Sequence, residues 1–381
     1  MAARRVVIFS ALYMPHLGGV EKFSQSIAAE LSTDCEVTVF CMNTESRPEF
    51  VKEGSVSVYY LPCVPMQKGR FPVPKPAAYR RVREWFEANE ADFAIVQCRF
   101  YLLSEWAVRF LAKKGIRYIQ IEHGAGDVVM PNKLVDFIWH TYEKALTESE
   151  KRFPHEWFGV SQASIRWLKH YGITGRGVIS NSVKPADFTD ALANRGSWRR
   201  EHGIPEDALI ISFSGRIMVD KGILELTQAF DRLRGDDLHL VIAGGGDMDL
   251  LEPWQGRENI HILGQVDFKD IPRIMVDSQI FCLPSRFIEG QPTSLLEAGY
   301  CGCAVTATAN GGITEVIPSE EYGLLIQTGD VDGLTEALQS LIDDPEKRER
   351  LGANLQARVR EHYTWATAAA KIRAVMDEYG L

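Results

Sequence analysis

Strand-like and helix-like segments alternate along most of the chain, and this alternation occurs twice. Runs of four or five residues, many of them β-branched, predict the strands, and stretches with helical periodicity lie between them. Alternation of this kind indicates parallel sheets covered by helices on both faces. The predicted strands are residues 6–9, 36–40, 93–96, 117–121, 158–161 and 177–180 in the first half, and 209–213, 238–242, 260–263 and 280–283 in the second.

Two consecutive sets of such segments predict an α/β protein with two doubly wound, Rossmann-like domains that face each other across a cleft. A chain of 381 residues is also long enough for two domains. Turn-forming residues cluster between Asn181 and Asp190, so we place the boundary there. We expect an N-terminal domain over residues 1–183, a C-terminal domain over residues 184–365, and a final helix, residues 366–381, that packs back towards the first domain.

Composition argues against several classes of protein. No apolar run reaches the ~18 residues that a membrane span needs, and the N-terminal segment lacks the cleavage site of a signal peptide. The seven cysteines form no Cys-x-x-Cys pair, which argues against a zinc site or a disulfide framework and favours a reducing cytoplasm. Residues 1–183 carry 23 Lys and Arg against 19 Asp and Glu, whereas residues 184–381 carry 19 against 32. Such an acidic second half argues against general nucleic-acid binding.

In open α/β sheets, ligands bind beyond the carboxyl ends of the strands, where loops lead into helices. Three such junctions in this chain carry unusual residues, and the first contains Gly18 and Gly19. Adjacent glycines leave backbone amides uncovered and let a ligand approach closely, and Glu21 suits the first turn of the helix that follows. An isolated Gly-Gly pair is more often a tight turn, and this alternative stays open.

The second junction places two cations five residues apart. Arg216 and Lys221 follow the predicted strand 209–213, and a helical pattern begins at Ile223. Both side chains suit a diphosphate, Arg through its planar fork and Lys as a mobile point charge. Taken alone, the two could equally be surface cations in solvent.

The third junction follows the last predicted strand and is the most specific. Pro292 suits the first position of a helix, and the free amides near Thr293 and Ser294 would then face an incoming phosphate. Glu289 lies in the loop before this helix, and Glu297 lies within it. The two carboxylates can therefore accept hydrogen bonds from hydroxyl groups of different parts of one ligand, although either could be an ordinary surface charge.

Together these segments resemble glycosyltransferase family 4. That family carries two glutamates separated by seven residues, then an apolar helix, Cys-Gly and a Gly-Gly-x-x-Glu segment. Glu289 and Glu297 have this spacing, and the matching later features are Gly302 and residues 310–315. Weaker matches are residues 18–21, 158–164 and 179–183, where Ser182 stands in place of the more common glycine, and the pair Arg216 and Lys221.

The resemblance implies a GT-B fold and a retaining hexosyltransferase. Its C-terminal domain would bind a nucleotide-diphosphate sugar, with UDP-sugars favoured and GDP-mannose as the alternative, and its N-terminal domain would bind the acceptor. The sugar would pass to a hydroxyl of a glycan or lipid-linked acceptor, in the synthesis of cell-surface polysaccharide or glycolipid. Two alternatives stay open: another GT-B enzyme such as a nucleotide-sugar epimerase, and a non-catalytic subunit that binds a sugar nucleotide.

The resemblance also implies roles for single residues. Arg216 and Lys221 would bind the diphosphate and stabilise the charge that grows on it during transfer. Glu289 would contact the donor sugar and Glu297 the ribose, while His123, at a predicted strand end, resembles the family histidine near the sugar. A lone histidine is more often structural. The expected catalytic set is Glu289, His123, Arg216 and Lys221, and the other donor contacts are Gly18, Gly19, Gly290, Gln291, Thr293, Ser294 and Glu297.

The sequence offers no obvious nucleophile, so the resemblance favours front-face attack assisted by the leaving phosphate. Residues 247–249 and 330–332 each spell Asp-x-Asp, the manganese-binding signature of the other major glycosyltransferase fold. Neither segment has a third ligand nearby in the sequence. We therefore expect no metal and no other cofactor.

One basic segment suggests where the protein acts. Residues 68–86 contain six cations and one anion in a chain of net charge −9, a composition suited to an anionic membrane surface. We hypothesise that this segment docks a cytoplasmic protein on the inner face of the plasma membrane. The alternative is an ordinary helix that buries its apolar residues and leaves its arginines in water. The aromatic residues of the segment are Phe71, Tyr79, Trp85 and Phe86.

Overall fold

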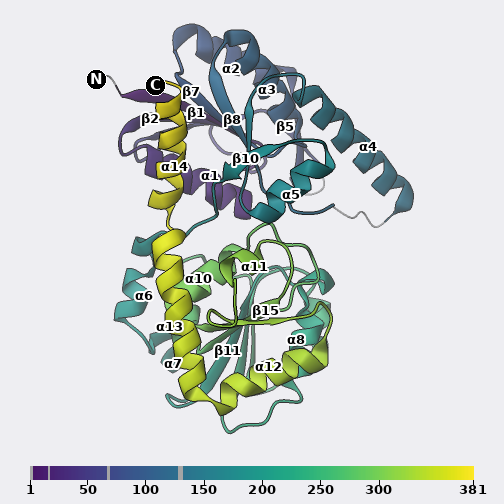
Figure 1. Cartoon of the computed structure of the whole chain (residues 1–381), viewed down its shortest axis with the longest axis vertical. Coiled ribbons are helices and arrows are strands. Elements are labelled where there is room, and N and C mark those ends of the chain that lie inside the picture. The colour runs from purple at the N-terminus through teal and green to yellow at the C-terminus, as the bar shows by residue number, and fades with distance from the viewer. Residues whose placement is uncertain (1–2, 16–17, 67–68, 128–131) are drawn as a thin grey trace. The chain divides into compact units, whose positions relative to one another are not determined.

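The computed structural model describes residues 3–15, 18–66, 69–127 and 132–381, and it divides the chain into two units (Figure 1). The first unit joins Met1–Asn181 to Trp365–Leu381, and the second is Ser182–Thr364. Each unit is built around its own sheet of mainly parallel strands. Lys68, the first residue of the basic segment, lies outside the described residues.

The first unit contains an eight-stranded sheet in which only the edge strand β3 runs antiparallel to its neighbour. The strand order reverses between β1 and β7, so the loops that follow these two strands diverge to opposite faces of the sheet. A separate antiparallel hairpin consists of β5 (Cys63–Met66) and β6 (Phe71–Pro74). The sheet order is β10 (Gly175–Val178), β9 (Glu156–Gly159), β8 (Arg117–Glu122), β7 (Phe93–Gln97), β1 (Arg4–Ser10), β2 (Cys35–Met42), β4 (Val56–Leu61) and β3 (Phe50–Glu53).

Helices cover both faces of this sheet, as the side chains of β1 show. Val6 and Ile8 point into one apolar cluster, whereas Val7 and Phe9 point into the other. This double burial is why the strand reads as a continuous apolar run in the sequence. The helices α1 (Gly19–Leu31) and α14 (Trp365–Glu378) pack on the side of Val6. The helices α2 (Pro76–Ala88) and α3 (Leu102–Lys114) pack on the side of Val7. The unit also contains α4 (Lys133–Glu150) and α5 (Gln162–His170).

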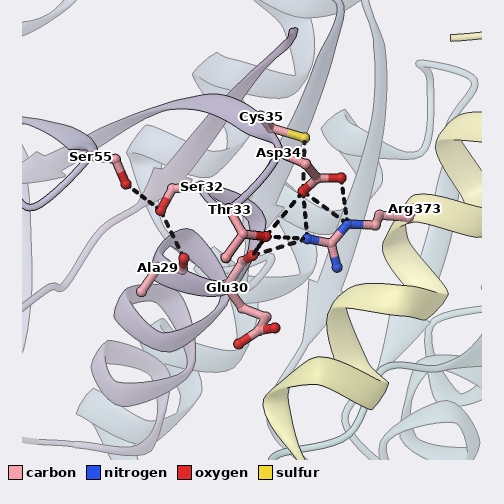
Figure 2. A network of polar contacts seen from close by, with 8 residues as sticks. All are labelled: Ala29, Glu30, Ser32, Thr33, Asp34, Cys35, Ser55 and Arg373. Carbon is pink, nitrogen blue, oxygen red and sulfur yellow. Dashed lines mark hydrogen bonds and ion pairs between the residues drawn. The ribbon is translucent and has the colours of Figure 1, made fainter.

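The C-terminal helix α14 belongs to the first unit and lies beside α1 (Figure 1). Trp365 packs edge-on against Phe23 of α1, with ring centroids 5.4 Å apart. Arg373 donates to the Asp34 carboxylate, with Nη2 2.6 Å from Oδ1, and to the Glu30 carbonyl at 3.0 Å (Figure 2). The hydrogen bonds that Arg373 donates to the Asp34 carboxylate lower the pKa of that group. Apolar and polar contacts together therefore fix the last helix.

The second unit has a six-stranded, fully parallel sheet whose order reverses between β11 and β14. One large apolar cluster includes residues from all six strands and from the long helices α12 and α13. The sheet order is β13 (Ile260–Gly264), β12 (Leu238–Ala243), β11 (Leu209–Ser214), β14 (Ile280–Leu283), β15 (Ala304–Thr308) and β16 (Leu324–Ile326).

The helices of the second unit connect these strands, as expected for a doubly wound sheet. They are α6 (Thr189–Ala193), α7 (Ser197–Glu201), α8 (Ile223–Phe230), α9 (Asp270–Asp277), α10 (Thr293–Cys301), α11 (Ile313–Val316), α12 (Val331–Asp343) and α13 (Pro345–His362). The second unit also has three short 3₁₀ segments, η1 (Pro185–Phe188), η2 (Val219–Lys221) and η3 (Met248–Trp254).

The prediction of two Rossmann-like α/β domains is confirmed. All seven cysteines are free and buried, and no helix in the described residues is long and apolar enough to span a membrane.

Candidate active site

The candidate active site of the second unit lies where the strand order reverses. β11 and β14 are neighbours in the sheet, and the loops after them carry Lys221 and Glu289. Since parallel strands end at the same edge, residues far apart in the chain meet there. The Lys221 Nζ lies 2.6 Å from Oε1 of Glu289.

The Glu289 carboxylate is held by more than this ion pair. The Ser285 hydroxyl donates to the same Oε1 at 2.7 Å, and the Glu289 carbonyl accepts from the amide of Gly312 at 2.8 Å. Glu289 is buried, whereas Lys221 is only partly so. A fixed carboxylate therefore faces a cation that keeps access to solvent, which suits a ligand carrying both hydroxyl and phosphate groups.

Two loops approach so closely that one position must be glycine. Gly222 has φ +71, and a Cβ built there would lie 1.9 Å from the Pro284 carbonyl oxygen. In the same region the Asp220 carbonyl accepts from the amides of Arg286, at 2.8 Å, and Phe287, at 3.0 Å. The Lys221 loop and the Glu289 loop are thus locked together through backbone contacts.

A third loop, after β15, supports the first two. The Asn310 side-chain amide donates to the Ser285 carbonyl at 2.7 Å, and the Thr308 hydroxyl donates to the same oxygen at 2.6 Å. Gly311 has φ +53, and an added Cβ would lie 2.0 Å from the Glu289 carbonyl oxygen. The sequence motif indicated the glycines of this loop, but it predicted no role for Ser285, Thr308 or Asn310.

The other residues of the second unit that were predicted to bind the donor lie close to Lys221 or Glu289 in the chain. Arg216, in the loop after β11, is exposed, and within the part of the chain that the structure describes its guanidinium has no ion pair. α10 begins at Thr293, one residue later than predicted, so Pro292 is the N-cap residue and not the first residue of the helix. The Pro292 side chain makes no capping hydrogen bond, so within the described structure it covers none of the amides in the first turn of α10. Gln291 and Glu297 are buried, and Gly290, Thr293 and Ser294 are partly exposed.

The predicted glycine turn lies in the first unit, at the start of α1. Gly18 is the N-cap, and an added Cβ would lie 2.4 Å from Oε2 of Glu21, which is buried in the first helical turn. At Gly19 an added Cβ would meet no atom of the described residues within 4 Å. Gly18 therefore makes room for Glu21, while the described residues leave the Cβ position of Gly19 uncrowded.

His123 follows β8 and is partly buried. Its Nε2 donates to Oε1 of Gln97 at 2.7 Å, and its ring lies edge-on to Phe23 at 4.8 Å between centroids. Burial lowers the pKa of His123 to about 3, so the ring is neutral near pH 7. With the proton on Nε2, Nδ1 is left as a hydrogen-bond acceptor.

A buried charge cluster that sequence reasoning missed holds the His123 loop. Oε1 of Glu122 accepts from the amides of His123, at 3.0 Å, and Gly124, at 2.8 Å. Its Oε2 lies 3.0 Å from Nε of Arg99, and Nη2 of Arg99 lies 2.6 Å from Oε1 of Glu143 in α4. The only sequence signal for this cluster is that Arg99 and Glu122 lie at or just after the ends of strands.

Two family models match consecutive parts of the chain. The Glycosyltransferase Family 4 model covers residues 17–187, and the model described as glycosyl transferases group 1 covers residues 194–358. The chain belongs to the family 4 type of glycosyltransferases. The predicted family is thereby confirmed, and the GT-B fold with it.

Relatives of this glycosyltransferase match nearly all of the chain or about half of it. An uncharacterised glycosyltransferase of Methanocaldococcus jannaschii is 24% identical, with 98% of each chain covered. A GDP-mannose-dependent monoacylated α-(1-6)-phosphatidylinositol monomannoside mannosyltransferase of Corynebacterium glutamicum is 27% identical over 52% of this chain and 55% of its own. Among solved structures, sucrose-phosphate synthase of Thermosynechococcus elongatus superposes with a TM-score of 0.79, at 19% identity and 99% coverage of both chains. Anabaena HepE in complex with UDP-glucose gives 0.73, at 17% identity and 98% and 99% coverage.

The two Asp-x-Asp segments of the glycosyltransferase have different local roles. Asp330 caps α12 by accepting from the Gly333 amide at 2.8 Å, and Asp332 pairs with Arg232 at 2.5 Å. Asp247 and Asp249 lie at the start of η3. The described residues contain no group of three or more His, Cys, Asp or Glu arranged to hold a metal ion.

Proposed function

We propose that this glycosyltransferase moves a sugar from a nucleotide-diphosphate sugar to an acceptor hydroxyl with retention of configuration. The observation that carries the proposal is the Lys221–Glu289 pair at the point where the strand order reverses. A cation and a carboxylate held side by side match the two halves of such a donor, its diphosphate and its sugar hydroxyls. Ligands of doubly wound sheets bind at this point.

The proposal assigns the diphosphate to three groups. Lys221 is partly exposed and can turn from Glu289 towards a phosphate, and Arg216 is exposed five residues earlier. The first-turn amides of α10, near Thr293 and Ser294, add partial positive charge from the helix N-terminus. Charge that accumulates on the departing diphosphate would be stabilised by these groups, which is where a transferase gains rate.

Glu289 is proposed to accept hydrogen bonds from the donor sugar. Its backbone is fixed by Gly312 and its carboxylate by Ser285, so it is held in place before the sugar binds. Amides at Gly290 and Gln291 would lie beside the sugar, and Glu297 in α10 would hold the ribose. In the first unit, Gly18 and Gly19 are proposed to let the donor approach the backbone closely, and neutral His123 offers Nδ1 as an acceptor.

We propose that the acceptor attacks from the same face that the diphosphate leaves, with a phosphate oxygen taking the acceptor proton. The C–O bond to the diphosphate breaks as the new glycosidic bond forms. The side chains proposed for this reaction, Lys221, Arg216 and Glu289, bind charge or hydroxyl groups, and we assign none of them as a nucleophile. Retention is tested by NMR of the product, in which an inverted anomeric configuration would refute this step.

UDP-sugars are the favoured donors, and GDP-mannose is the alternative. HepE, a neighbour in fold, was crystallised with UDP-glucose, whereas the Corynebacterium relative is GDP-mannose-dependent. That relative is named for a monoacylated phosphatidylinositol monomannoside, which supports a lipid-linked acceptor here. A thermal-shift series over UDP- and GDP-sugars identifies the base, because a ligand that binds only the folded state raises the melting temperature.

Donor consumption that proceeds equally without acceptor would favour an epimerase or hydrolase over a transferase.

A further inference from the structure

The first half of α4 carries apolar side chains that nothing in the described structure covers. Leu134, Val135, Phe137 and Ile138 are 67%, 45%, 69% and 58% exposed. We refer to these four residues as the α4 apolar face. Their clustering within five positions of one helix makes a contiguous patch, and soluble proteins seldom expose such patches without a partner.

The α4 apolar face is presented by an anchored helix. The Asn132 side chain caps α4 by accepting from the Leu134 amide at 2.8 Å. Farther along, Glu143 is buried and pairs with Arg99 at 2.6 Å, and Thr147 and Glu150 are also buried. One side of α4 is therefore fixed to the first unit, and the helical spacing places the apolar face on the other side of the helix.

A second set of exposed apolar residues adjoins this face. The ring of Trp139, next to Ile138 in sequence, packs against Phe71 of β6 with centroids 4.4 Å apart. Phe71 belongs to the β5–β6 hairpin, which exposes Val64, Met66 and Val73 by 45%, 50% and 40%. The Trp139–Phe71 contact thus joins the α4 apolar face to the exposed side of the hairpin.

Exposed basic residues lie on α4 and on the segment that runs from β6 into α2. The aromatic residues that were predicted to accompany them in α2 are not exposed in the same way. Val82 and Phe86 of α2 are buried, and Trp85 packs edge-on against Phe40. The alternative drawn from the sequence, a helix with its apolar residues inside, is what α2 shows. The exposed cations of these segments are Arg70, Lys75, Arg80 and Arg83 on or before α2, and Lys133 and Lys144 on α4; Arg80 also pairs with Glu84 at 3.7 Å.

We propose that the α4 apolar face and the exposed side of the β5–β6 hairpin dock on an anionic phospholipid bilayer. Apolar side chains would enter the interface, and the surrounding cations would contact the lipid headgroups. A second copy of the chain is a poorer occupant, because a symmetric contact would place the same basic residues opposite one another. The acidic groups nearest the face, Asp127 and Asp136, both contact His140, at 3.0 Å and 3.6 Å.

Co-sedimentation with vesicles tests the proposal directly. Full-length protein is mixed with phosphatidylcholine vesicles, with or without phosphatidylglycerol, at low and high salt. The expected result is binding to the anionic vesicles at low salt, reduced about tenfold or more in Phe137→Ser/Ile138→Ser. Phe50→Ser is the matched control, since Phe50 is 48% exposed on β3 of the same unit. Wild type remaining in the supernatant, or the double variant binding equally, would overturn the proposal.

Site-specific labelling provides a second readout. All seven native cysteines are buried, so Ile138→Cys introduces an exposed thiol for an environment-sensitive fluorophore, with Phe50→Cys as the control. A blue shift on anionic vesicles at position 138 but not at position 50 supports insertion of α4. Sedimentation velocity without lipid identifies the competing occupant, because self-association abolished by Phe137→Ser would make this face a homotypic interface. Neither donor nor acceptor is present, so these results do not depend on the proposed transfer reaction.

Discussion

Lys221 and Glu289 are 68 positions apart in the chain, yet Nζ and Oε1 lie 2.6 Å apart. The contact exists because the strands that precede them, β11 and β14, are neighbours in the parallel sheet. Gly222 lets the two loops touch, and Ser285 holds the carboxylate from the other side. The pair is therefore a product of sheet order rather than of local sequence.

Removing either member of this pair should abolish most of the activity. Glu289→Ala and Lys221→Ala are each expected to lower kcat on the order of 10²–10³-fold, because each removes a group proposed to act in transfer. Thermal melts should change little, since Glu289 lies on a loop and Lys221 is the last residue of the short 3₁₀ segment η2. Lys269→Ala is the control, because Lys269 is a cation of the same unit with a 78% exposed side chain. Near-normal turnover in either site variant would remove the assignment.

The close approach of the two loops predicts a difference between two glycines. Gly222 and Gly256 both have positive φ, but only Gly222 has an atom within 4 Å of an added Cβ among the described residues. Gly256→Ala should therefore cost about 1–2 kcal/mol, from the left-handed backbone alone. Gly222→Ala should cost more and weaken UDP binding, because the Lys221 and Glu289 loops must separate. Urea denaturation and titration with UDP measure both effects, and equal losses in the two variants would contradict the argument.

Much of the fold was predictable, because apolar periodicity dominates parallel strands. The ten predicted strands all exist, with ends shifted by up to two residues. β3, β4, β15 and β16 were not predicted, although Val56–Leu61 and Ala304–Thr308 are rich in β-branched and aromatic residues. The β5–β6 hairpin, with a proline in each strand, lacks the alternation that identifies a strand.

The candidate site was predictable only in its parts. Sequence placed Lys221 and Glu289 after strands, but their contact depends on which strands become neighbours. Ser285, Thr308 and Asn310 act through single hydrogen bonds to loop backbone, for which no residue pattern exists. The roles given to Lys221, Glu289, Arg216, His123 and Glu297, like those of the other predicted donor contacts, remain predictions.

The buried imidazole of His123 predicts a pH effect on stability. Its pKa is lowered to about 3 in the folded protein, against about 6.5 in an unfolded chain, so the unfolded state binds the proton first. Stability from this group is present above pH 6.5 and is lost as pH falls towards 3. His155, with a pKa lowered to about 4, acts in the same direction.

Denaturation at pH 7 and pH 5 measures this effect. The free energy of unfolding of wild type should fall more between these values than that of His123→Asn, which cannot take up the proton. His362→Asn serves as the control, because His362 is exposed on α13. An equal pH dependence in wild type and His123→Asn would show that the ring is accessible to protons in the folded state.

Activity should survive an excess of chelator. In the proposed site, the diphosphate is held by Lys221, Arg216 and the amides at the start of α10, and cations and amides need no bridging ion. Initial rates with and without EDTA test this, after dialysis to remove bound ions. Loss of activity restored by manganese or magnesium would show that Asp247 and Asp249 were wrongly discounted.

Glu122 should act as a positioning residue for His123, and Glu143 provides the comparison. Both carboxylates pair with the buried Arg99, but only Glu122 also accepts from the amides of His123 and Gly124. Glu122→Met and Glu143→Met should both destabilise the first unit, by about 3–5 kcal/mol, because each leaves Arg99 with one fewer partner.

Only Glu122→Met should also lower kcat, by about tenfold or more, because the His123 loop would lose both amide contacts. Glu122→Gln should recover most of this loss, since its amide oxygen can still accept from the two backbone groups. Assays run well below the melting temperature of each variant separate kcat from folding. If Glu143→Met lowers kcat as much as Glu122→Met, or if Glu122→Gln recovers nothing, the cluster contributes to stability alone.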